Sequence, residues 1–464
     1  MTLQSFPRLM IAAPSKSSGK TLLSIGLVAA LTKRGMDVQP FKKGPDFIDP
    51  RWLTFAASGR ECRNLDIFLM GRDVVFDLFI KNGANADISI IEGNHGLFDG
   101  QDIEGGDCGA GLAGLLQVPV LLVVDCRGFA RGIAPLVRGL LNFPGGEHIK
   151  GVILNNVATP RHEKRLRAAL ERYCELPILG VLPRNPNVVI DERHLGLEPV
   201  GEREELGDRI SVIGDFVAEN VDINAVIDLA NSTSPHDLPP PAVESEQVES
   251  QIKVAYAADR AFHFYYPDNL EALQRQGVEL IPFSMLQDAK LPDVDGLFIG
   301  GGFPEMFMEE LAANSSMMSD IRLQVDRGLP VYAECGGLMV LAEQIKWKDR
   351  TARFAGAIPV DIVMNTRPQG YGFMELSSSG ELPWPDVGRS VRCHEFHYSK
   401  VVRMGKGVKF AYKVNRGFGV DGQHDGILYK NVFASYAHIH AASEKGWAEF
   451  LASFWRQNWI NRTK

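Results

Sequence analysis

Short apolar segments alternate with helix-forming stretches through the first half of the chain. Helical patterns fill the intervals between these segments, for example at 20–34 and 161–173. The apolar segments read RLMIAAP, DVQPFKK, DISIIEG, VPVLLVVD, GVILNNV and LPILGVLP. Such runs, separated by helices, are typical of strands buried on both faces of a parallel sheet. The pattern therefore predicts a domain built from βα units.

The second half repeats this rhythm with different loop chemistry, in the segments IKVAYAAD, GVELIPF, GLFIGGG and LPVYAEC. Between the halves, residues 231–250 lose the apolar periodicity and are rich in Pro, Ser and acidic residues. Such a composition buries too little apolar surface to offset the entropy of ordering, so we interpret 231–250 as a linker. The sequence thus predicts two α/β domains with mostly parallel sheets, at 1–230 and 251–464.

Composition and charge narrow the functional classes. The chain has 464 residues, of which 45% are hydrophobic and 23% charged, close to the average for globular domains. A net charge of −8 disfavours a nucleic-acid or anionic-membrane surface, and we expect neither partner. The six cysteines include no C-x-x-C pair, which argues against a disulfide framework or a zinc site.

No segment reads as a targeting or transmembrane sequence. The first residues lack a basic stretch followed by an apolar one, and the longest apolar run is broken by Gln117 and Pro119. Together with the cysteine pattern, this predicts a cytoplasmic protein.

A phosphate-binding loop follows the first predicted strand. Residues 14–21 read PSKSSGKT and lie between a strand and a helical stretch, which is the context that such a loop requires. Lys20 can reach the β- and γ-phosphates of a nucleotide, and the Thr21 hydroxyl can ligate Mg²⁺. Three small residues let backbone N–H groups face a phosphate at the helix N-terminus: Ser17, Ser18 and Gly19.

The loop predicts ATP binding. Pro14 stands where the motif usually has its first glycine, so the match is a variant. A Ser/Gly-rich turn with an exposed lysine is the plainer alternative, which the intact G-K-T and its placement disfavour.

Candidate ligands for Mg²⁺ lie at the ends of two predicted strands. Asp46 follows the second strand and Glu92 ends the third, where an open α/β sheet gathers its ligands. Mg²⁺ prefers oxygen ligands and keeps several waters, so these two carboxylates and Thr21 form the expected metal site. A helix cap or a turn is the alternative role for Asp46, and equally for Asp49 and Asp99.

Two lysines end the second predicted strand. We expect Lys42 to stabilise charge on a transferring phosphoryl group, with a solvated surface lysine as the alternative. For Lys43 the solvated alternative is the preferred interpretation.

A cysteine occupies a strand-to-helix turn in the second half. The apolar run at 329–334 ends at Cys335, and a helical pattern resumes after two glycines. Such an elbow exposes a nucleophile and places the following N–H beside a developing oxyanion, so Gly336 is one expected donor. Gly302, in the glycine-rich segment after another strand, is the second. A buried structural cysteine is the alternative for Cys335.

A cysteine nucleophile needs a base, which can be remote in sequence. His438 and His440 lie in an apolar segment that begins at Val432 and reads as a strand, where alternation places both on one face. Spacing alone therefore does not choose between them. His394 and His397 form another pair, but it lacks the spacing of H-E-x-x-H and no third metal ligand is evident.

Taken together, these motifs resemble the cobyrinic acid a,c-diamide synthase family, over essentially the whole chain. That family joins a dethiobiotin-synthetase-like P-loop domain to a class I glutamine amidotransferase-like domain. The segments that carry the resemblance are APSKSSGKT, FKKGPDFIDP, EGNHGLFDG, LGVLPR, ERHLGL (192–197), GGGFPE, AECGGLMVL, HEFHYS and SYAHIH. The resemblance implies an ATP- and glutamine-dependent ligase of cobalamin biosynthesis that amidates the a and c acetates of a cobyrinic acid-type tetrapyrrole.

The resemblance also implies roles for individual residues. Cys335 would hydrolyse glutamine, and His438 would be the base, because it matches the histidine of the family's Y-x-H segment. Ammonia would pass to the other domain, where ATP activates the substrate carboxylate as an acyl phosphate. The implied small-molecule partners are ATP, glutamine and the tetrapyrrole carboxylate, and a homodimer is one possible assembly.

Some positions depart from the family pattern. His440 stands where many class I amidotransferases carry the glutamate of a triad, so we expect a Cys–His dyad whose orienting group is not identified. Asn94 and His95 stand where cobyrinate enzymes often carry Val and Met, and Cys393 replaces a common glycine. With the unusual segment at 105–111, these changes keep sirohaem and nickel sirohydrochlorin as alternative substrates.

Two other classes of protein compete with this interpretation. One is a P-loop switch or partitioning ATPase with an inactive second domain. Lys16 does not match the signature lysine of those ATPases, and an intact Cys335 elbow with His438 is unexpected in an inactive domain. The other is a dethiobiotin-synthetase-like ligase acting on carbon dioxide, which would not need residues 251–464.

Overall fold

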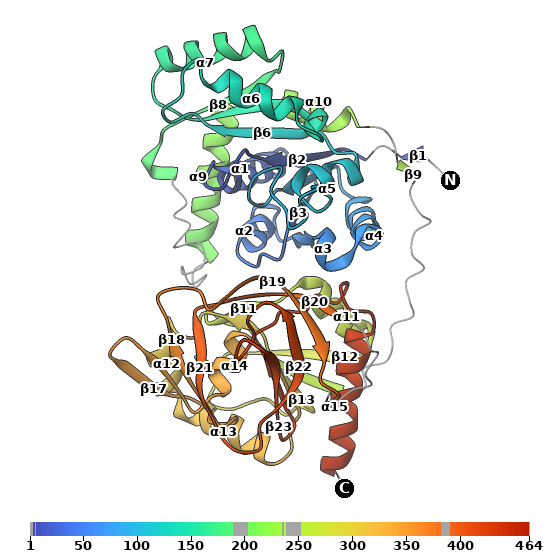
Figure 1. The fold of residues 1–464 in the computed structure, drawn as a ribbon, viewed down its shortest axis with the longest axis vertical. Coiled ribbons are helices and arrows are strands. Elements are labelled where there is room, and N and C mark those ends of the chain that lie inside the picture. Colours follow the sequence, from blue (N-terminus) through green and yellow to red (C-terminus); the bar gives the residue numbers. More distant parts are fainter. Residues whose placement is uncertain are drawn as a thin grey trace. The chain divides into compact units, whose positions relative to one another are not determined.

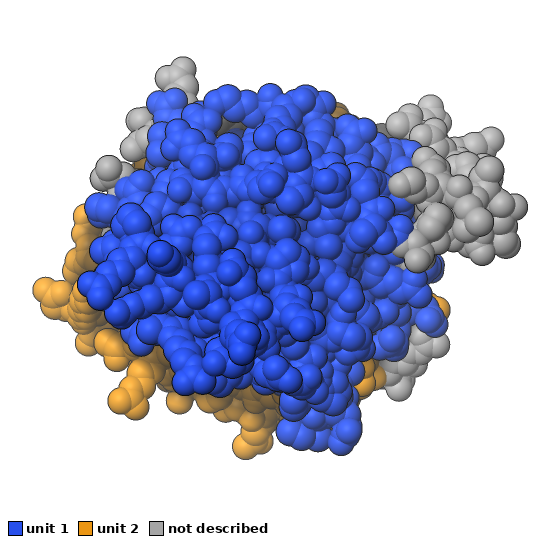
Figure 2. Space-filling model, turned by 90° about the horizontal axis from the view of Figure 1, so that it is seen from above, with its two compact units in different colours: residues 1–243 blue, residues 244–464 orange. Residues whose placement is uncertain are grey.

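The computed structural model describes residues 3–4, 6–188, 203–233, 236–237, 252–381 and 390–463. The chain divides into two compact units, residues 1–243 and 244–464 (Figures 1 and 2). Each unit has α/β architecture, which confirms the predicted fold class. Most of the predicted linker and residues 192–197 of one motif lie outside the described residues, so the domain limits given above stay predictions.

The first unit is built on a parallel sheet of seven strands (Figure 1). In spatial order the strands are β4 (Arg63–Leu65), β3 (Val38–Lys43), β5 (Ile88–Glu92), β2 (Arg8–Ala12), β6 (Val120–Asp125), β7 (Ile149–Val157) and β8 (Ile178–Pro183). The central strands are buried along their whole length, as their continuous apolar sequences predict. A separate short antiparallel ladder is formed by β1 (Leu3–Gln4) and β9 (His236–Asp237).

Helices cover both faces of this sheet. One face shares a hydrophobic core with α1 (Lys20–Lys33), α2 (Asp49–Ala56), α9 (Arg203–Asn220) and α10 (Ile223–Asn231). On the other face, Phe79 of α4 (Arg72–Gly83) contacts Phe41 of β3. The remaining helical segments are α3 (Ile67–Met70), α5 (Gly109–Leu116), α6 (Ile133–Asn142), η1 (Gly146–His148), α7 (Pro160–Tyr173) and η2 (Pro186–Val188).

Helix α1 is apolar on nearly every side because it lies between the sheet and α9. Its residues Leu23, Leu27 and Leu31 are buried, and Gly26 faces α9 so closely that a Cβ there would lie 2.2 Å from Val217 Cγ2. Such an all-apolar helix is typical of one buried within a layer rather than exposed on a surface. The packing fixes the N-terminus of α1 at the end of β2.

The second unit contains a sheet of nine strands, in which four pairings are parallel and four are antiparallel. The first five in spatial order pair in parallel: β12 (Val278–Phe283), β10 (Ile252–Ala257), β13 (Gly296–Ile299), β15 (Val331–Glu334) and β24 (Val432–Ser435). The others extend it in antiparallel fashion: β23 (His424–Tyr429), β22 (Lys409–Arg416), β19 (Gly370–Ser378) and β20 (Val391–His397). This half goes beyond the parallel sheet that the sequence predicts.

Two smaller sheets complete this unit. They are the pair β11 (Phe262–Phe264) and β14 (Gly301–Gly302), and a four-stranded sheet of β16 (Gln344–Trp347), β17 (Arg350–Arg353), β18 (Val360–Met364) and β21 (Ser399–Met404). The helices are α11 (Pro267–Arg275), α12 (Met308–Ala313), α13 (Ser315–Asp326), α14 (Gly336–Leu341) and α15 (Trp447–Thr463). Two hydrophobic clusters fill the interior, one around α12–α14 and one against α15.

Candidate active sites

The phosphate-binding loop connects β2 to α1, as the sequence predicts. Ser17 and Gly19 have positive φ angles of 55° and 96°, and Gly19 is the N-cap of α1. Lys20 is buried, and its Nζ donates a hydrogen bond to Ser15 O at 3.1 Å. The loop is thus folded back on the helix N-terminus, where the helix dipole and backbone N–H groups favour an anion.

Asn155, at the end of β7, holds this loop from the neighbouring strand. Its Nδ2 donates to Ser18 O at 2.8 Å, and a Cβ at Gly19 would lie 2.1 Å from the same nitrogen. Glycine is therefore required at position 19 both by the backbone angle and by this close approach. The sequence motifs do not point to Asn155, although the pair of asparagines that follows an apolar run is a signal visible in the sequence.

Lys42 stands at the centre of a cluster of carboxylates. Its side chain is 3% exposed, and its Nζ lies 2.9 Å from Glu92 Oε1 and 3.9 Å from Asp46 Oδ2. It also forms an ion pair with Asp49 Oδ2. The solvated-lysine alternative is therefore wrong for Lys42. Lys43 is buried as well, so the solvated interpretation preferred for it is also wrong.

The three carboxylates of the cluster have different environments. Asp46 Oδ1 accepts hydrogen bonds from Ile48 N and Asp49 N, so this oxygen holds the turn before α2, while Oδ2 faces Lys42. Asp49, which the pattern left open between two roles, lies in the cluster, with Oδ2 3.5 Å from Thr21 Oγ1. Asp99, by contrast, accepts from Gly96 N within a turn.

Glu92 is the most enclosed member of the cluster. It is fully buried at the end of β5, and Thr21 Oγ1 donates to its Oε1 at 2.8 Å. Its Oε2 is a buried oxygen without a hydrogen-bond partner in the described part of the chain. A hydroxyl, a carboxylate and an unpartnered oxygen are hard donors that fit Mg²⁺, which needs few protein ligands.

The proton affinities in this cluster follow from burial and mutual repulsion. Burial, and then the charge of Asp49, raises the pKa of Glu92 to about 8, although Lys42 acts in the opposite direction. Burial and Asp49 likewise raise the pKa of Asp46 to about 6. Burial alone would lower the pKa of Lys42, but the surrounding carboxylates outweigh it and raise this pKa. The cluster has a deficit of positive charge that a divalent cation would relieve.

The loop and the cluster line one cavity of about 730 Å³. The carboxyl ends of β2, β3, β5, β6 and β7 contribute to it, as expected for the ligand edge of an open α/β sheet. The lining residues include Lys16, Ser17, Gly19, Lys20, Thr21, Lys42, Asp46, Asp49, Glu92, Asn94, His95, Arg127, Asn155, Asn156, Asn185 and Phe216. Ser18 is not among the residues lining the cavity, but it is tied to the loop through Asn155.

The second site is the turn between β15 and α14. Cys335 has φ 48° and ψ −99°, a combination that residues other than glycine rarely adopt. The residue is only 5% exposed. Its N–H donates to Ser435 O at 2.7 Å, which fixes the elbow to the end of β24. The strand-to-helix turn is the one that the sequence predicts, and its backbone is strained. The expected exposure of the nucleophile is not found, because Cys335 is buried.

The two glycines expected at the oxyanion position lie side by side. A Cβ built on Gly336 would be 3.1 Å from Gly302 N and 3.0 Å from Pro304 Cδ. A Cβ on Gly302 would collide with Ala261 O at 1.9 Å. The collision excludes any side chain at position 302, while a Cβ at position 336 would be tight, so the backbone of these two segments lies close together beside the elbow.

His438 and His440 do not continue a strand. Strand β24 ends at Ser435, because buried Asp425 accepts the N–H groups of Tyr436 and Ala437, both at 3.1 Å. The prediction of a strand through position 440 with both histidines on one face is therefore wrong. The structure distinguishes the two histidines as candidate bases, because their rings have different neighbours.

The ring of His438 lies beside the elbow. Its Nδ1 is 3.3 Å from Oε2 of Glu334, the residue that precedes Cys335, and a Cβ on Gly301 would lie 2.6 Å from its Cε1. His440 is directed elsewhere, with Nε2 3.7 Å from Asp268 Oδ2. The base predicted at His438 is thus near the oxyanion glycines. Glu334 is a residue that sequence reasoning missed.

The Cys335 thiol is held in its neutral form. Burial raises its pKa above the ordinary value, the carboxylate of Glu305 adds to this effect, and the N–H of Gly336 opposes it. A neutral thiol is a weak nucleophile, so the site requires a base to take its proton when substrate is bound.

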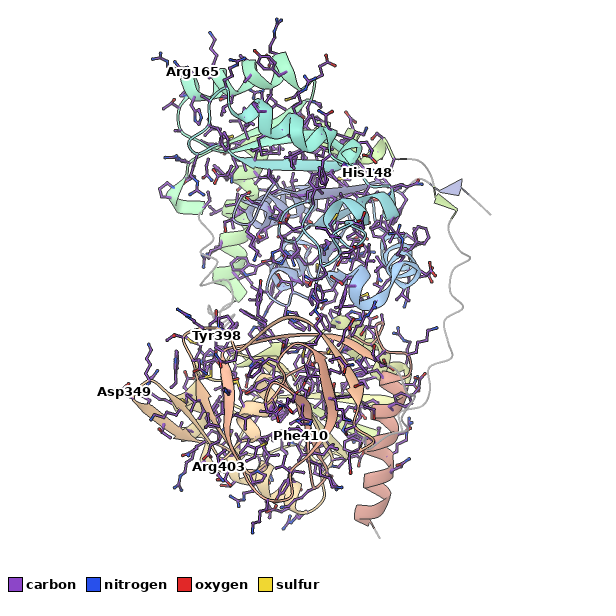
Figure 3. All side chains as sticks on the ribbon, in the orientation of Figure 1. His148, Arg165, Asp349, Tyr398, Arg403 and Phe410 are labelled. Carbon is purple, nitrogen blue, oxygen red and sulfur yellow. The ribbon has the colours of Figure 1, made fainter. Side chains whose placement is uncertain are left out.

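The segment HEFHYS forms the other wall of the elbow. Phe396 O lies 3.9 Å from Cys335 Sγ, and the chain turns from β20 into β21 at Tyr398, which Figure 3 labels. His397 is buried between Glu395 and Ser399 O, with ring nitrogens 3.3 Å and 2.8 Å from them. The bonding of His397 to Glu395 and to a backbone carbonyl accounts for both of its ring nitrogens without a metal ion.

Comparison with known proteins assigns both halves of the chain. Residues 9–197 match the family described as CobQ/CobB/MinD/ParA nucleotide binding domain, and residues 253–446 match the CobB/CobQ-like glutamine amidotransferase domain. In the described part of the chain, no helix is long and apolar enough to cross a membrane.

Three curated relatives are similar over nearly the whole length, and each is named cobyrinate a,c-diamide synthase. The protein from Magnetococcus marinus is 57% identical, over 97% of both chains. The protein from Methanosarcina barkeri is 38% identical, over 97% of this chain and 96% of its own. The protein from Listeria monocytogenes is 40% identical, over 93% and 96%. Their common name gives no support to sirohaem or nickel sirohydrochlorin as the substrate.

Proposed function

The chain belongs to the cobyrinate a,c-diamide synthase family, and from this premise we propose that it converts the a and c acetate carboxylates of cobyrinic acid into carboxamides. It is a glutamine-dependent ligase that uses ATP. The proposal extends to the order of events: ATP activates each carboxylate as an acyl phosphate, and ammonia from glutamine then displaces the phosphate.

The first unit carries out the activation in this proposal. A carboxylate oxygen of the substrate attacks the γ-phosphorus, ADP leaves, and the acyl phosphate forms. Lys20 and Lys42 stabilise charge on the transferring phosphoryl group, which is chiefly a matter of positioning and electrostatics. Mg²⁺ supplies charge neutralisation for the phosphates when bound, and Thr21, Glu92 and Asp46 are the residues that would hold it.

The second unit supplies the ammonia. Cys335 Sγ attacks the side-chain carboxamide of glutamine, with His438 taking the thiol proton and returning it to the departing ammonia. Gly302 and Gly336 N–H groups stabilise the oxyanion. Water then releases glutamate from the thioester, and the ammonia attacks the acyl carbon of the activated substrate.

The observation that carries the proposal is that both sites occur in one chain that matches a relative of this name over 97% of its length. The phosphate-loop cavity provides for activation, and the strained Cys335 elbow provides for glutamine hydrolysis. Amidation needs both sites. Ammonia does not react with a carboxylate until activation has turned a carboxylate oxygen into part of a good leaving group.

The test is incubation of the purified chain with glutamine, MgATP and one ring substrate at a time, followed by mass spectrometry of the ring. The substrates are cobyrinic acid, sirohaem and nickel sirohydrochlorin. We expect two amidations of cobyrinic acid and none of the others within the same time. Amidation of sirohaem alone, or glutamine hydrolysis without any ring product, would contradict the proposal.

A further inference from the structure

We infer that Glu334 is the positioning residue that orients His438, so that the glutaminase site is a Cys–His–Glu arrangement whose glutamate precedes the nucleophile. This inference rests on the proposed glutaminase function of the second unit. It supplies the orienting group that the sequence left unidentified, since His440 stands where many class I amidotransferases carry a glutamate.

Glu334 reaches His438 because of the pairing between β15 and β24. These strands run in parallel with Glu334 opposite Ser435, so the end of β15 lies next to the turn that carries His438. Glu334 is 2% exposed and His438 is 3% exposed, and Oε2 lies 3.3 Å from Nδ1. The contact between the two side chains is therefore enclosed by protein. In such a site a carboxylate interacts strongly with an imidazole.

The carboxylate is itself held in place. Tyr332 Oη donates to Glu334 Oε1 at 2.8 Å, and Trp447 Nε1 donates to Tyr332 Oη at 3.3 Å. The Tyr332 bond occupies Oε1 of the carboxylate, and Oε2 is the oxygen beside Nδ1 of His438. An orienter that is fixed by its own neighbours is what a catalytic base requires.

The backbone on both sides of His438 is also fixed. Its N–H donates to His394 O at 2.8 Å and its O accepts from His394 N at 3.2 Å. These bonds fix the main chain, so the ring can move only by rotation about its side-chain bonds. The contact between Nδ1 and Glu334 restricts that rotation. Hydrogen bonding at Nδ1 selects the tautomer that leaves Nε2 as the acceptor.

The proton balance of the step gives Glu334 its role. The thiol proton moves to Nε2 of His438 as the S–C bond to the glutamine carboxamide forms, which leaves an imidazolium. The carboxylate of Glu334 stabilises this cation without taking its proton, as the aspartate of a serine-protease triad does. The same proton then leaves with ammonia, so Glu334 ends the cycle unchanged.

His440 does not have this role. Its Nδ1 accepts from Ala442 N at 3.1 Å, and its ring packs on Tyr266 with centroids 4.6 Å apart. Asp268 provides a matched comparison, because it places a carboxylate 3.7 Å from Nε2 of His440 in the same unit. The two carboxylate–histidine pairs differ in that only the Glu334 pair adjoins Cys335.

The experiment compares Glu334→Gln with Asp268→Asn in the full chain, measuring glutamate release and, separately, amidation of the ring with ammonium chloride as nitrogen source. For E334Q we expect glutaminase kcat to fall by roughly 10²- to 10⁴-fold with little change in KM, by analogy with loss of a triad orienter. Ammonium-dependent amidation should stay at the wild-type rate. For D268N both activities should stay within about twofold of wild type, because the Asp268 carboxylate lies beside His440, which has no role in this mechanism.

A spectroscopic readout separates orientation from general damage. In protein labelled with ¹⁵N-histidine, His438 is assigned by comparison with His438→Asn, and its Nδ1–H tautomer should lose population in E334Q. If E334Q fails to fold, Glu334→Asp keeps the charge but withdraws the carboxylate, and its kcat should fall while ammonium use remains.

Full glutaminase kcat in E334Q or E334D, or equal losses in E334Q and D268N, would overturn the inference. A wild-type chain that releases no glutamate would instead refute the proposed function itself.

Discussion

Gly19 in the phosphate loop and Cys335 in the elbow both have positive φ angles. At Gly19 the conformation is available without strain because no Cβ is present, and the space is taken by Asn155. At Cys335 a side chain is required for the chemistry, so the strain is retained. The same backbone feature thus has opposite residue requirements at the two sites.

Gly19→Ala is expected to weaken ATP binding by at least about tenfold and to destabilise the chain by about 1–2 kcal/mol, because of the left-handed backbone and the clash with Asn155. Isothermal titration calorimetry and thermal unfolding measure the two effects. Gly35→Ala is the matched control, since Gly35 has φ 83° but nothing within 4 Å of its Cβ position. It should show the loss of stability with unchanged ATP affinity; weaker binding in both variants would contradict the role given to Asn155.

His394 makes the stability of the second unit depend on pH. Burial, and then the neighbouring His438 and His397, lowers the pKa of His394 to about 3. In the unfolded chain histidine binds a proton below its ordinary pKa of about 6.5, whereas the folded chain does not until about pH 3. This contribution to stability is therefore complete above about pH 6.5 and is lost as the pH falls toward 3.

His394→Gln is expected to flatten this dependence, which has a slope of at most about 1.4 kcal/mol per pH unit for one group. Urea unfolding at several pH values between 4 and 7, followed by tryptophan fluorescence, measures it. The signal comes mostly from residues 244–464, which hold all but one of the six tryptophans. An identical acid slope in wild type and variant would contradict the assignment.

At the scale of elements, the sequence predicted those segments whose structure depends on local rules. The loop between β2 and α1 and the elbow between β15 and α14 were predicted because a strand, a turn of small residues and a helix follow each other directly. The prediction for β24 is too long at its C-terminal end. The strand ends where the Asp425 carboxylate accepts hydrogen bonds from the backbone N–H groups of residues 436 and 437. That bond joins separate strands and leaves no local signal.

The packing of α1 against α9 gives a prediction at this scale. Gly26→Ala should destabilise the first unit by about 1–3 kcal/mol, because its Cβ would lie 2.2 Å from Val217 Cγ2. Gly139→Ala, at an exposed position of α6 with nothing within 4 Å, should instead stabilise it by about 0.5–1 kcal/mol through helix propensity. Differential scanning calorimetry compares them. The double change with Val217→Ala should recover part of the loss at Gly26; no recovery would point to a cause other than this contact.

At the scale of the whole molecule, the missing parts of the prediction are contacts between distant segments. Glu334 and His438 are 104 positions apart, and Lys42 meets Glu92 across 50 positions. Residue types suggested Lys42, Glu92 and His438 one by one, but only the strand order brings each of them to its partner. The fold class and the two candidate sites were accessible from sequence, whereas the orienting group was not. The cytoplasmic location and a homodimer stay predictions.

The division of chemistry between the units predicts separable losses. Lys20→Ala should release glutamate from glutamine at the wild-type rate but lose ATP-dependent amidation by roughly 10²-fold or more. Cys335→Ser should lose glutamine-dependent amidation and keep amidation with ammonium chloride. Glutamate release and ring mass spectrometry are measured for both proteins. Glutamine use by C335S, or normal amidation by K20A, would show that the corresponding residue was wrongly placed in the mechanism.

The strained backbone at Cys335 has an evolutionary consequence. A residue held in such a conformation costs about 1–3 kcal/mol, and glycine at this position would remove most of that cost. Replacement of the cysteine by glycine therefore relieves this strain while it ends glutamine hydrolysis. Selection for stability alone would therefore favour glycine at position 335. We expect the cysteine to be retained only where glutamine is the source of nitrogen.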